Sequence, residues 1–167
     1  NSRYLNAALR REVERSRRYR TPLSIIFLDL DGFKNVNDRH GHMWGSRTLV
    51  EVGAVVRETV RTIDVVARFG GDEFTVILPQ TDRQGARVIA ERLRERIAAA
   101  RYLMAYGIDV HLTASLGIAT YPEDGRTGDD LLACADRAMY RAKEAGKDRV
   151  AAGAASGAVL AGKAASR

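Results

Sequence analysis

The sequence predicts an α+β domain with one mostly antiparallel, five-stranded sheet flanked by helices. Three observations support this fold class. Helix-like and strand-like apolar patterns follow one another as helix, strand, helix, two strands, helix, strand, helix and a short last strand. The two consecutive strands flank a glycine pair, Gly70-Gly71, which is a hairpin signal. The length of 167 residues suits one hydrophobic core. A single sheet with helices packed on it satisfies this order of elements.

Helices are expected where apolar residues recur with helical spacing. The first covers residues 4–18, where Leu5, Leu9 and Val13 share one face, and Thr21-Pro22 ends it. Similar patterns predict helices over about 44–61, 83–100 and 131–142, the last closed by Gly146. Residues 33–39 are expected to form a short helix or a turn.

Strands are expected in the remaining apolar runs. Residues 23–28 are almost continuously apolar, which predicts a central strand buried on both faces. The hairpin strands cover 65–67 and 74–78, and we expect Gly70-Gly71 to supply the positive φ angles of the turn. Small or polar residues alternate with apolar ones over 111–119, and a short strand lies near 149–150.

Composition and charge exclude several classes of protein. Hydrophobic residues make up 46% and charged residues 29%, which is typical of a globular domain. The net charge is +6, of which +5 lies in residues 1–20, so a nucleic-acid polymer is a poor partner for the nearly neutral remainder. No apolar run is long enough for a membrane span, and no signal peptide is visible. The single cysteine, Cys134, is expected to be a small core residue, and a cytoplasmic location fits.

The expected domain covers residues 1–150, and only the C-terminal segment lies outside it. Residues 151–167 are almost all Ala, Gly and Ser, and we expect a disordered tail. The chain begins nearly inside its first helix, so we expect it to be part of a longer protein.

Acidic residues mark the candidate site. Asp29 and Asp31 end the central strand, and Asp72 and Glu73 follow the glycine pair. If the two strands are neighbours, these carboxylates converge, and Mg²⁺ would offset their repulsion. The simpler interpretation is a set of solvated surface acids.

Lysines lie near these acids in the expected fold. Lys34 follows the first acidic pair, and Lys143 and Lys147 lie one helical turn apart near the end of the last helix. Metal ions and lysines together indicate a polyphosphate substrate and nucleotidyl transfer with two metal ions. Each lysine alone is equally typical of a solvated surface. No phosphate-binding loop and no nucleophile turn of the Gly-x-Ser-x-Gly type are present.

The motif Gly-Gly-Asp-Glu-Phe at residues 70–74 resembles the signature of the GGDEF domains, the diguanylate cyclases of bacterial signalling. Other family motifs occur in the same order, and the resemblance covers about residues 3–150. These motifs occupy residues 28–34, 37–38, 41–42, 68–69, 115–119 and 135–143.

The resemblance implies a fold like that of the class III nucleotidyl cyclases, with a ferredoxin-like core. It implies condensation of two nucleoside triphosphates into a cyclic dinucleotide with release of two pyrophosphates. A two-fold homodimer presents one triphosphate from each subunit, with two Mg²⁺ or Mn²⁺ ions in each half-site. A regulatory domain commonly precedes such a domain.

The resemblance also assigns roles to residues at matching positions. Metal ligands are expected at Asp29, the carbonyl of Leu30 and Asp72, and Glu73 assists the metal or takes the hydroxyl proton. The triphosphate is expected to contact Phe33, Lys34, Lys143 and Lys147. The rest of the nucleotide is expected at Asn37, His42, position 46 and Gly71, where the glycine lets the backbone approach closely.

A product-inhibition site is implied by Arg-x-x-Asp, which in the family stands just before the signature. Here Arg61 and Asp64 match, with Arg61 nine residues before Gly70. Arg92 lies where a second inhibitory arginine is expected, and the ligand would be cyclic di-GMP. Guanidinium groups suit both phosphate and the guanine edge.

Two positions depart from the family pattern. Ser46 replaces an aspartate that reads guanine, and a serine hydroxyl cannot accept from both guanine donors. The change resembles the hybrid promiscuous (Hypr) subgroup, which accepts ATP and GTP and makes cyclic GMP-AMP beside cyclic di-GMP. Lys147-Asp148 replaces the common Arg-Asn, which removes a bidentate phosphate contact.

Two alternatives to a hybrid enzyme stay open. The first is a strict diguanylate cyclase that converts two GTP into cyclic di-GMP. The second is a catalytically silent sensor that binds cyclic di-GMP through Arg61, Asp64 and Arg92. The presence of Asp29, Asp72 and Glu73 favours an enzyme.

Overall fold

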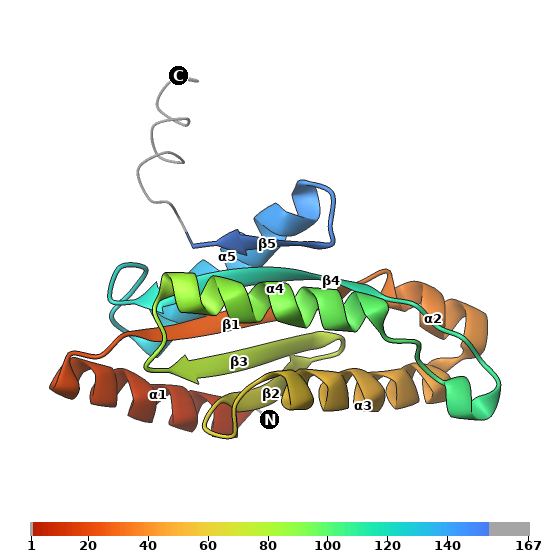
Figure 1. Cartoon of the computed structure of the whole chain (residues 1–167), viewed down its shortest axis with the longest axis horizontal. Coiled ribbons are helices and arrows are strands. Elements are labelled where there is room, and N and C mark those ends of the chain that lie inside the picture. Colours follow the sequence, from red (N-terminus) through yellow and green to blue (C-terminus); the bar gives the residue numbers. More distant parts are fainter. Residues whose placement is uncertain (1, 154–167) are drawn as a thin grey trace, which may run out of the picture.

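The computed structural model describes residues 2–153, which form one five-stranded sheet with helices on both faces (Figure 1). The strand order is β2-β3-β1-β4-β5, and the α+β prediction is confirmed. The helices are α1 (Ser2–Tyr19), α2 (Phe33–His40), α3 (His42–Thr59), α4 (Arg83–Ala99) and α5 (Gly128–Glu144), with a 3₁₀ turn at Met104–Tyr106. The strands are β1 (Leu23–Asp31), β2 (Val65–Gly70), β3 (Glu73–Pro79), β4 (Thr113–Tyr121) and β5 (Arg149–Ala152).

The central strand β1 is the one that carries the longest apolar run. It pairs antiparallel with β3 on one side and with β4 on the other, whereas β4 and β5 are parallel. All of its residues except Asp29 are buried, as expected for a strand covered on both faces. The register places Asp29 opposite Glu73 of β3 and opposite Ser115 of β4, so these three side chains belong to one face at one end of the sheet.

Two apolar layers hold the helices against the sheet. Ile26 and Leu28 face a core that includes side chains of α2, α3 and α4. Ile25 and Phe27 point the other way, into a core shared with α1 and α5. Figure 1 shows α4 crossing in front of the sheet and β5 at its edge beside β4. Asp29 and Asp31 have the parity of Ile25 and Phe27, so they lie on the face that α5 covers.

Helix α5 lies very close to β4 because Gly117 has no side chain. A Cβ atom at Gly117 would lie 2.1 Å from the carbonyl oxygen of Ala135 and 2.3 Å from the amide nitrogen of Met139. Backbone atoms cannot give way as a flexible side chain can, so this glycine sets the distance between helix and sheet. The C-terminal end of α5 is thereby brought next to the end of β1.

Two predicted boundaries can be compared with the structure. Residues 33–40 form a true helix, α2, rather than a turn. Strand β5 extends to Ala152, so the expected domain boundary at residue 150 is two residues short of the sheet. The rest of the expected tail, residues 154–167, lies outside the described residues. Cys134 is buried, as predicted for a core residue.

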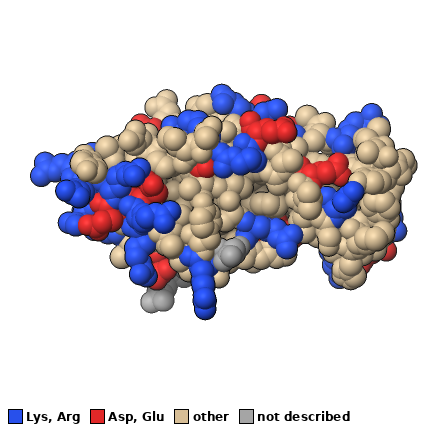
Figure 2. Space-filling view, turned by 90° about the horizontal axis from the view of Figure 1, so that it is seen from below, with Lys and Arg blue, Asp and Glu red and all other residues tan. Residues whose placement is uncertain are grey.

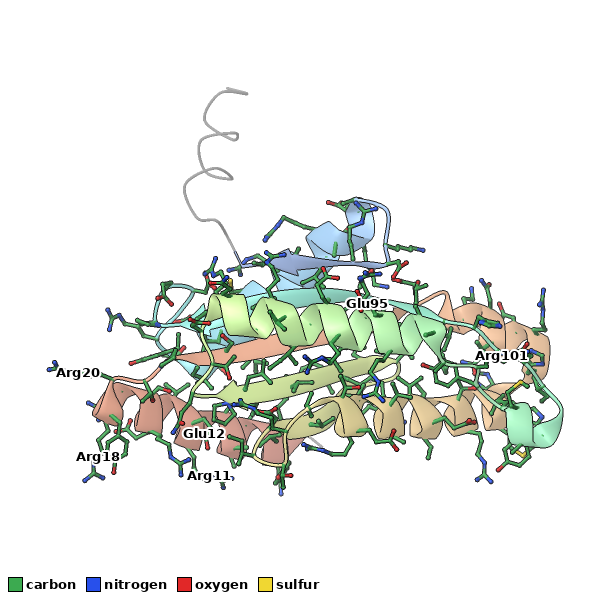
Figure 3. All side chains as sticks on the ribbon, in the orientation of Figure 1. Arg11, Glu12, Arg18, Arg20, Glu95 and Arg101 are labelled. Atoms are coloured by element: carbon green, nitrogen blue, oxygen red, sulfur yellow. The ribbon has the colours of Figure 1, made fainter. Side chains whose placement is uncertain are left out.

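The arginines of the basic N-terminal segment lie on the exposed face of α1 or directly after this helix. Figure 2 shows basic and acidic side chains together at this end of the molecule, and Figure 3 shows Arg11, Arg18 and Arg20 pointing outward. Arg17 pairs with Glu14, and Arg15 lies 3.6 Å from Glu12. Such exposed pairs contribute little to stability, typically about 0–1 kcal/mol. Among residues 2–153, no helix has the length and apolar character needed to cross a membrane.

Candidate active site

The end of β1 and the β2–β3 turn together form an acidic edge of the sheet, which we call the carboxylate edge (Asp29, Asp72 and Glu73). The amide of Leu30 donates a hydrogen bond to the carbonyl of Asp72 at 3.2 Å, and the strand register sets Asp29 opposite Glu73. The predicted neighbourhood of the two acidic pairs is therefore present. It arises because β1 and β3, distant in sequence, are adjacent strands.

The glycine pair does not have the backbone conformation that we predicted for it. Neither Gly70 nor Gly71 has a left-handed backbone, so positive φ is not the reason for glycine at these positions. A Cβ atom at Gly71 would meet nothing within 4 Å, and Gly71 lines a cavity. The glycine therefore keeps open a space beside the carboxylate edge.

Asp29 is the least satisfied carboxylate of the edge. Its Oδ2 lies 3.1 Å from the ammonium nitrogen of Lys143, while its Oδ1 is buried and has no hydrogen-bond partner. Burial, reinforced by the charge of Asp72, raises the pKa of Asp29 to about 6, against the opposing effect of Lys143. A buried carboxylate oxygen without a donor is costly, which makes Asp29 a strong candidate to take a cation.

Glu73 also has an altered proton affinity. Burial, together with the charges of Asp72 and Asp136, raises the pKa of Glu73, and Lys143 acts in the opposite direction. A carboxylate with a raised pKa is a better proton acceptor at neutral pH than an ordinary one. Glu73 is partly exposed, so a substrate can reach it.

Asp31 differs from its neighbour, although the acidic pattern alone grouped them together. It is buried and accepts hydrogen bonds from Thr113 and Ser115, both at 2.7 Å. Burial opposes ionisation of Asp31, but these hydroxyl donors, the amide of Asp148 and the ammonium of Lys143 outweigh it and lower the pKa. Asp31 is thus a satisfied structural carboxylate.

The carboxylate edge fits a hard divalent cation without forming a complete cage. Within residues 2–153, no three His, Cys, Asp or Glu side chains are arranged to hold a metal ion. The predicted ligands are only two carboxylates, Asp29 and Asp72, and the carbonyl of Leu30. Mg²⁺ is commonly bound by one or two carboxylates plus water and substrate phosphates, so this donor set and the unpartnered oxygen of Asp29 suit it.

A cavity of about 430 Å³ adjoins the carboxylate edge between α2, α3 and the β2–β3 turn. It brings together residues that are far apart in sequence. The lining residues are Phe33, Lys34, Asn37, His42, Ser46, Leu49, Arg68, Gly71 and Asp72. Six of them are predicted nucleotide-binding residues, and Asp72 belongs to the carboxylate edge as well. We refer to this space as the α2–α3 cavity.

Sequence reasoning assigned no role to Leu49, Arg68 or Gly45 in this cavity. Arg68 stands two residues before the glycine pair and belongs to a family motif. The motif alone does not show that its side chain reaches this cavity. Gly45 allows α2 and α3 to approach, because a Cβ atom there would lie 1.8 Å from Oδ1 of Asn37 and 3.3 Å from the ring of Phe33. The missing side chain at Gly45 therefore gives Asn37 its place at the cavity wall.

The two predicted phosphate lysines lie in different settings. Lys143, in the last turn of α5, is half-buried and lies 3.1 Å from both Asp29 and Asp31. Lys147 does not continue the helix, which ends at Glu144; it is exposed in a left-handed turn with φ of 64°. The expectation of two lysines on one helical face is therefore wrong, because the chain reverses direction between them.

The predicted inhibitory residues form one tight pair and one separate arginine. The guanidinium of Arg61 donates to the buried Asp64 at 2.8 Å, and also to the carbonyl of Pro79 and the hydroxyl of Thr81. These contacts tie the end of α3 to the end of β3. Arg92 lines a separate hollow on α4, so the structure does not bring it into contact with Arg61.

The fold and site together define a nucleotidyl-cyclase-like domain with a carboxylate edge and an adjacent polar cavity. A profile described as "Diguanylate cyclase, GGDEF domain" matches residues 1–149. The chain therefore belongs to the GGDEF diguanylate cyclase family, which confirms the resemblance seen in the motifs.

Two curated relatives from Pseudomonas aeruginosa illustrate the similarity. The chain is 40% identical over 144 residues to the bifunctional diguanylate cyclase/cyclic di-GMP phosphodiesterase MucR, covering 86% of this chain and 20% of MucR. It is 40% identical over 146 residues to the diguanylate cyclase DgcP, covering 87% of this chain and 22% of DgcP. The chain thus spans only about a fifth of either relative.

Solved structures show the same fold. The GGDEF domain of YfiN (TpbB) from P. aeruginosa superposes with a TM-score of 0.86 at 35% identity, covering 90% of this chain and 93% of that domain. The GGDEF domain of DgcB from Caulobacter crescentus, solved in complex with c-di-GMP, gives a TM-score of 0.82 at 27% identity, covering 89% and 87% of the two chains.

Proposed function

We propose that this domain condenses two nucleoside triphosphates into a 3′,5′-cyclic dinucleotide and releases pyrophosphate, with GTP as a substrate. The observation that carries the proposal is the position of Asp72, which belongs to the carboxylate edge and also lines the α2–α3 cavity. A nucleotide whose base lies in the cavity has its phosphates directed to the edge. Names and activities of the relatives agree with this reaction.

The bond changes follow from the residues of the edge. The 3′-hydroxyl oxygen of one nucleotide attacks the α-phosphorus of the other, and the bond from that phosphorus to the β-phosphate oxygen breaks. Glu73 takes the hydroxyl proton, for which its raised pKa suits it. Lys34 and Lys143 bind the triphosphate, and Lys147 adds a further cation. A second round closes the ring and releases the second pyrophosphate.

Asp29, Asp72 and the carbonyl of Leu30 would hold Mg²⁺ or Mn²⁺, two ions in each half-site. Such ions supply charge stabilisation for the attacking and leaving oxygens. One half-site offers one nucleotide, so a homodimer must bring two half-sites together. We place this catalytic domain, residues 1–150, in the cytoplasm.

Release of pyrophosphate tests the reaction. The purified chain is incubated with GTP and Mg²⁺, and pyrophosphate and nucleotide products are measured. We expect release by the unmodified chain and none by Asp72→Ala. Binding of cyclic di-GMP without any turnover would instead favour the silent sensor.

We further propose that base selectivity is relaxed, so that ATP is accepted and cyclic GMP-AMP is made beside cyclic di-GMP. Ser46 is exposed and lines the α2–α3 cavity, where a carboxylate would repel N1 of adenine and accept two donors from guanine. Loss of such a paired contact typically costs about 1–3 kcal/mol of discrimination. A strict diguanylate cyclase remains the competing assignment.

Products from an equimolar mixture of ATP and GTP decide between these two assignments. A hybrid enzyme yields cyclic GMP-AMP, and Ser46→Asp suppresses the mixed product in favour of cyclic di-GMP. If the unmodified chain makes cyclic di-GMP alone, the hybrid assignment is rejected while the cyclase assignment stands.

We also propose product inhibition by cyclic di-GMP through Arg61, Asp64 and Arg92. The side chain of Arg61 is 46% exposed, so it can contact a phosphate while it keeps its bond to Asp64. Inhibition that persists unchanged in Arg92→Gln would remove Arg92 from the site.

A further inference from the structure

We propose that Asp31 is a positioning residue, which holds Lys143 and the turn at residues 146–148 in the arrangement that binds a triphosphate. The inference rests on the proposed function and adds a role to a residue to which the family resemblance assigned none. Asp31 does not line the α2–α3 cavity, and its oxygens are occupied by protein donors. It therefore acts through other residues.

Both oxygens of Asp31 are fully used. Oδ1 accepts from Ser115 at 2.7 Å and from the ammonium of Lys143 at 3.1 Å. Oδ2 accepts from Thr113 at 2.7 Å and from the backbone amide of Asp148 at 3.0 Å. Two donors come from β4 and two from α5 and the turn that follows it. One buried carboxylate thus connects the end of α5 to the end of the central strand β1 and to β4.

The turn after α5 needs such a fastening, because its backbone is unfavourable. Lys147 and Asp148 have φ angles of 64° and 46°, and neither is glycine. Left-handed conformations at consecutive non-glycine residues persist only where surrounding contacts impose them. The amide of Asp148 is held by Asp31, and its side chain lies 3.1 Å from Arg94 of α4. These contacts fix the direction in which Lys147 leaves the turn.

Lys143 contacts both Asp29 and Asp31, which have different proposed roles. Its ammonium lies 3.1 Å from one oxygen of each carboxylate. If Asp29 serves a metal ion, its attraction for the lysine is weakened, whereas Asp31 is not a predicted metal ligand and keeps the ammonium beside the edge. An ammonium has three N–H donors, so one can stay on Asp31 while the others turn to phosphate oxygens.

The test uses 3′-deoxy-GTP, which carries the full triphosphate but lacks the attacking hydroxyl. Its dissociation constant is measured by calorimetry with Mg²⁺ for the full chain, Asp31→Asn, and Asp109→Asn as a matched control. Asp109 accepts from a cationic side chain, Arg101, but it is exposed and belongs neither to the carboxylate edge nor to the lining of the α2–α3 cavity. We expect about tenfold weaker binding for Asp31→Asn, because charge-assisted contacts to phosphate are lost, and no change for the control.

A background without Lys143 and Lys147 separates positioning from general support of the fold. In a chain carrying Lys143→Gln and Lys147→Gln, binding is already weak, and Asp31→Asn should weaken it no further. If Asp31→Asn lowers affinity by the same factor in this background, or has no effect in the unmodified chain, the positioning role is overturned.

Two outcomes keep the inference apart from the proposed function. An unmodified chain that binds no 3′-deoxy-GTP overturns the proposed function and with it this inference, whereas an affinity that Asp31→Asn leaves unchanged overturns the positioning role alone. If Asp31→Asn does not fold, Thr113→Val removes one of the four donors. A several-fold loss of affinity then supports the role, and unchanged affinity overturns it.

Discussion

Asp29 and Asp31 stand two residues apart on the same face of β1, yet their surroundings are opposite. Asp31 is buried with four donors, which lower its pKa. Asp29 has one ion pair and one unpartnered oxygen, and burial raises its pKa to about 6. The difference arises from β4: Ser115 and Thr113 turn their hydroxyls to Asp31, and neither donates to Asp29.

A satisfied and an unsatisfied carboxylate thus stand side by side at the edge of one sheet. The satisfied carboxylate contributes stability and order, while the other has a buried oxygen that no donor of the described residues satisfies. Functional sites often lower the stability of a fold, and well-packed, hydrogen-bonded neighbours hold such sites in place. Exchanging or removing each carboxylate should therefore have opposite effects on stability.

The largest expected effect is the loss of stability in Asp31→Ala. Removing this carboxylate leaves the half-buried Lys143 without one of its two anionic partners and releases the turn amide of Asp148. Breaking a buried pair on one side typically costs about 3–5 kcal/mol. Urea unfolding measures the free energy; a loss below about 1 kcal/mol would contradict the assigned structural role.

Asp29→Asn should reduce activity without reducing stability. The amide side chain cannot serve a metal ion as a carboxylate does, so pyrophosphate release should fall about hundredfold or more, as expected when charge stabilisation is lost. In chelator, the same variant should be at least as stable as the unmodified chain, because a costly buried charge is removed. Added Mg²⁺ should raise the melting temperature of the unmodified chain only. A variant that keeps both activity and the Mg²⁺ response would remove Asp29 from the site.

The contributions of Asp29 and Asp31 to stability should change with pH in opposite directions. A carboxylate whose folded pKa is raised favours its protonated form, so the contribution of Asp29 to stability falls as the pH rises from about 4 to 6. The advantage of Asp29→Asn in chelator should therefore be absent below pH 4 and reach about 1–2 kcal/mol above pH 6. Asp31 has a lowered pKa, so its own contribution is lost as the solution is acidified. Unfolding curves from pH 4 to pH 7 check this, and an equal advantage at both ends would refute it.

The smallest expected effect concerns the other region of the site, the α2–α3 cavity. Gly45→Ala should displace Asn37 and weaken 3′-deoxy-GTP binding several-fold, since the new Cβ atom would overlap its side chain. The gain in helix propensity, about 1 kcal/mol, should keep the chain folded. Gly53→Ala on the same helix is the matched control, because its Cβ atom would make an ordinary 3.6 Å contact with Phe74. Equal binding by both variants would show that Asn37 is not needed.

The sequence was a good guide where the signal was local. The apolar run of β1, the helical spacing of α1 and the motif at residues 70–74 each determined an element close to its observed bounds. It was a poor guide where position depended on contacts between distant elements. The glycine pair lacks the expected positive φ, and Lys147 leaves α5 for a turn that is held by Asp31 from the other end of the chain.

What the sequence determined by itself is the set of elements and the family motifs, because periodicity and motif spacing are properties of the chain. Six residues that these motifs predict to bind a nucleotide lie in one cavity of the structure. What only the tertiary structure decided is which acid is satisfied by donors and which keeps an unpartnered oxygen. Asp29 and Asp31 are identical in type and almost adjacent, and nothing local distinguishes them. The distinction depends on hydroxyls, a lysine and an amide contributed from residues 113–148. A carboxylate's proton affinity is set by the donors and charges that folding brings to it.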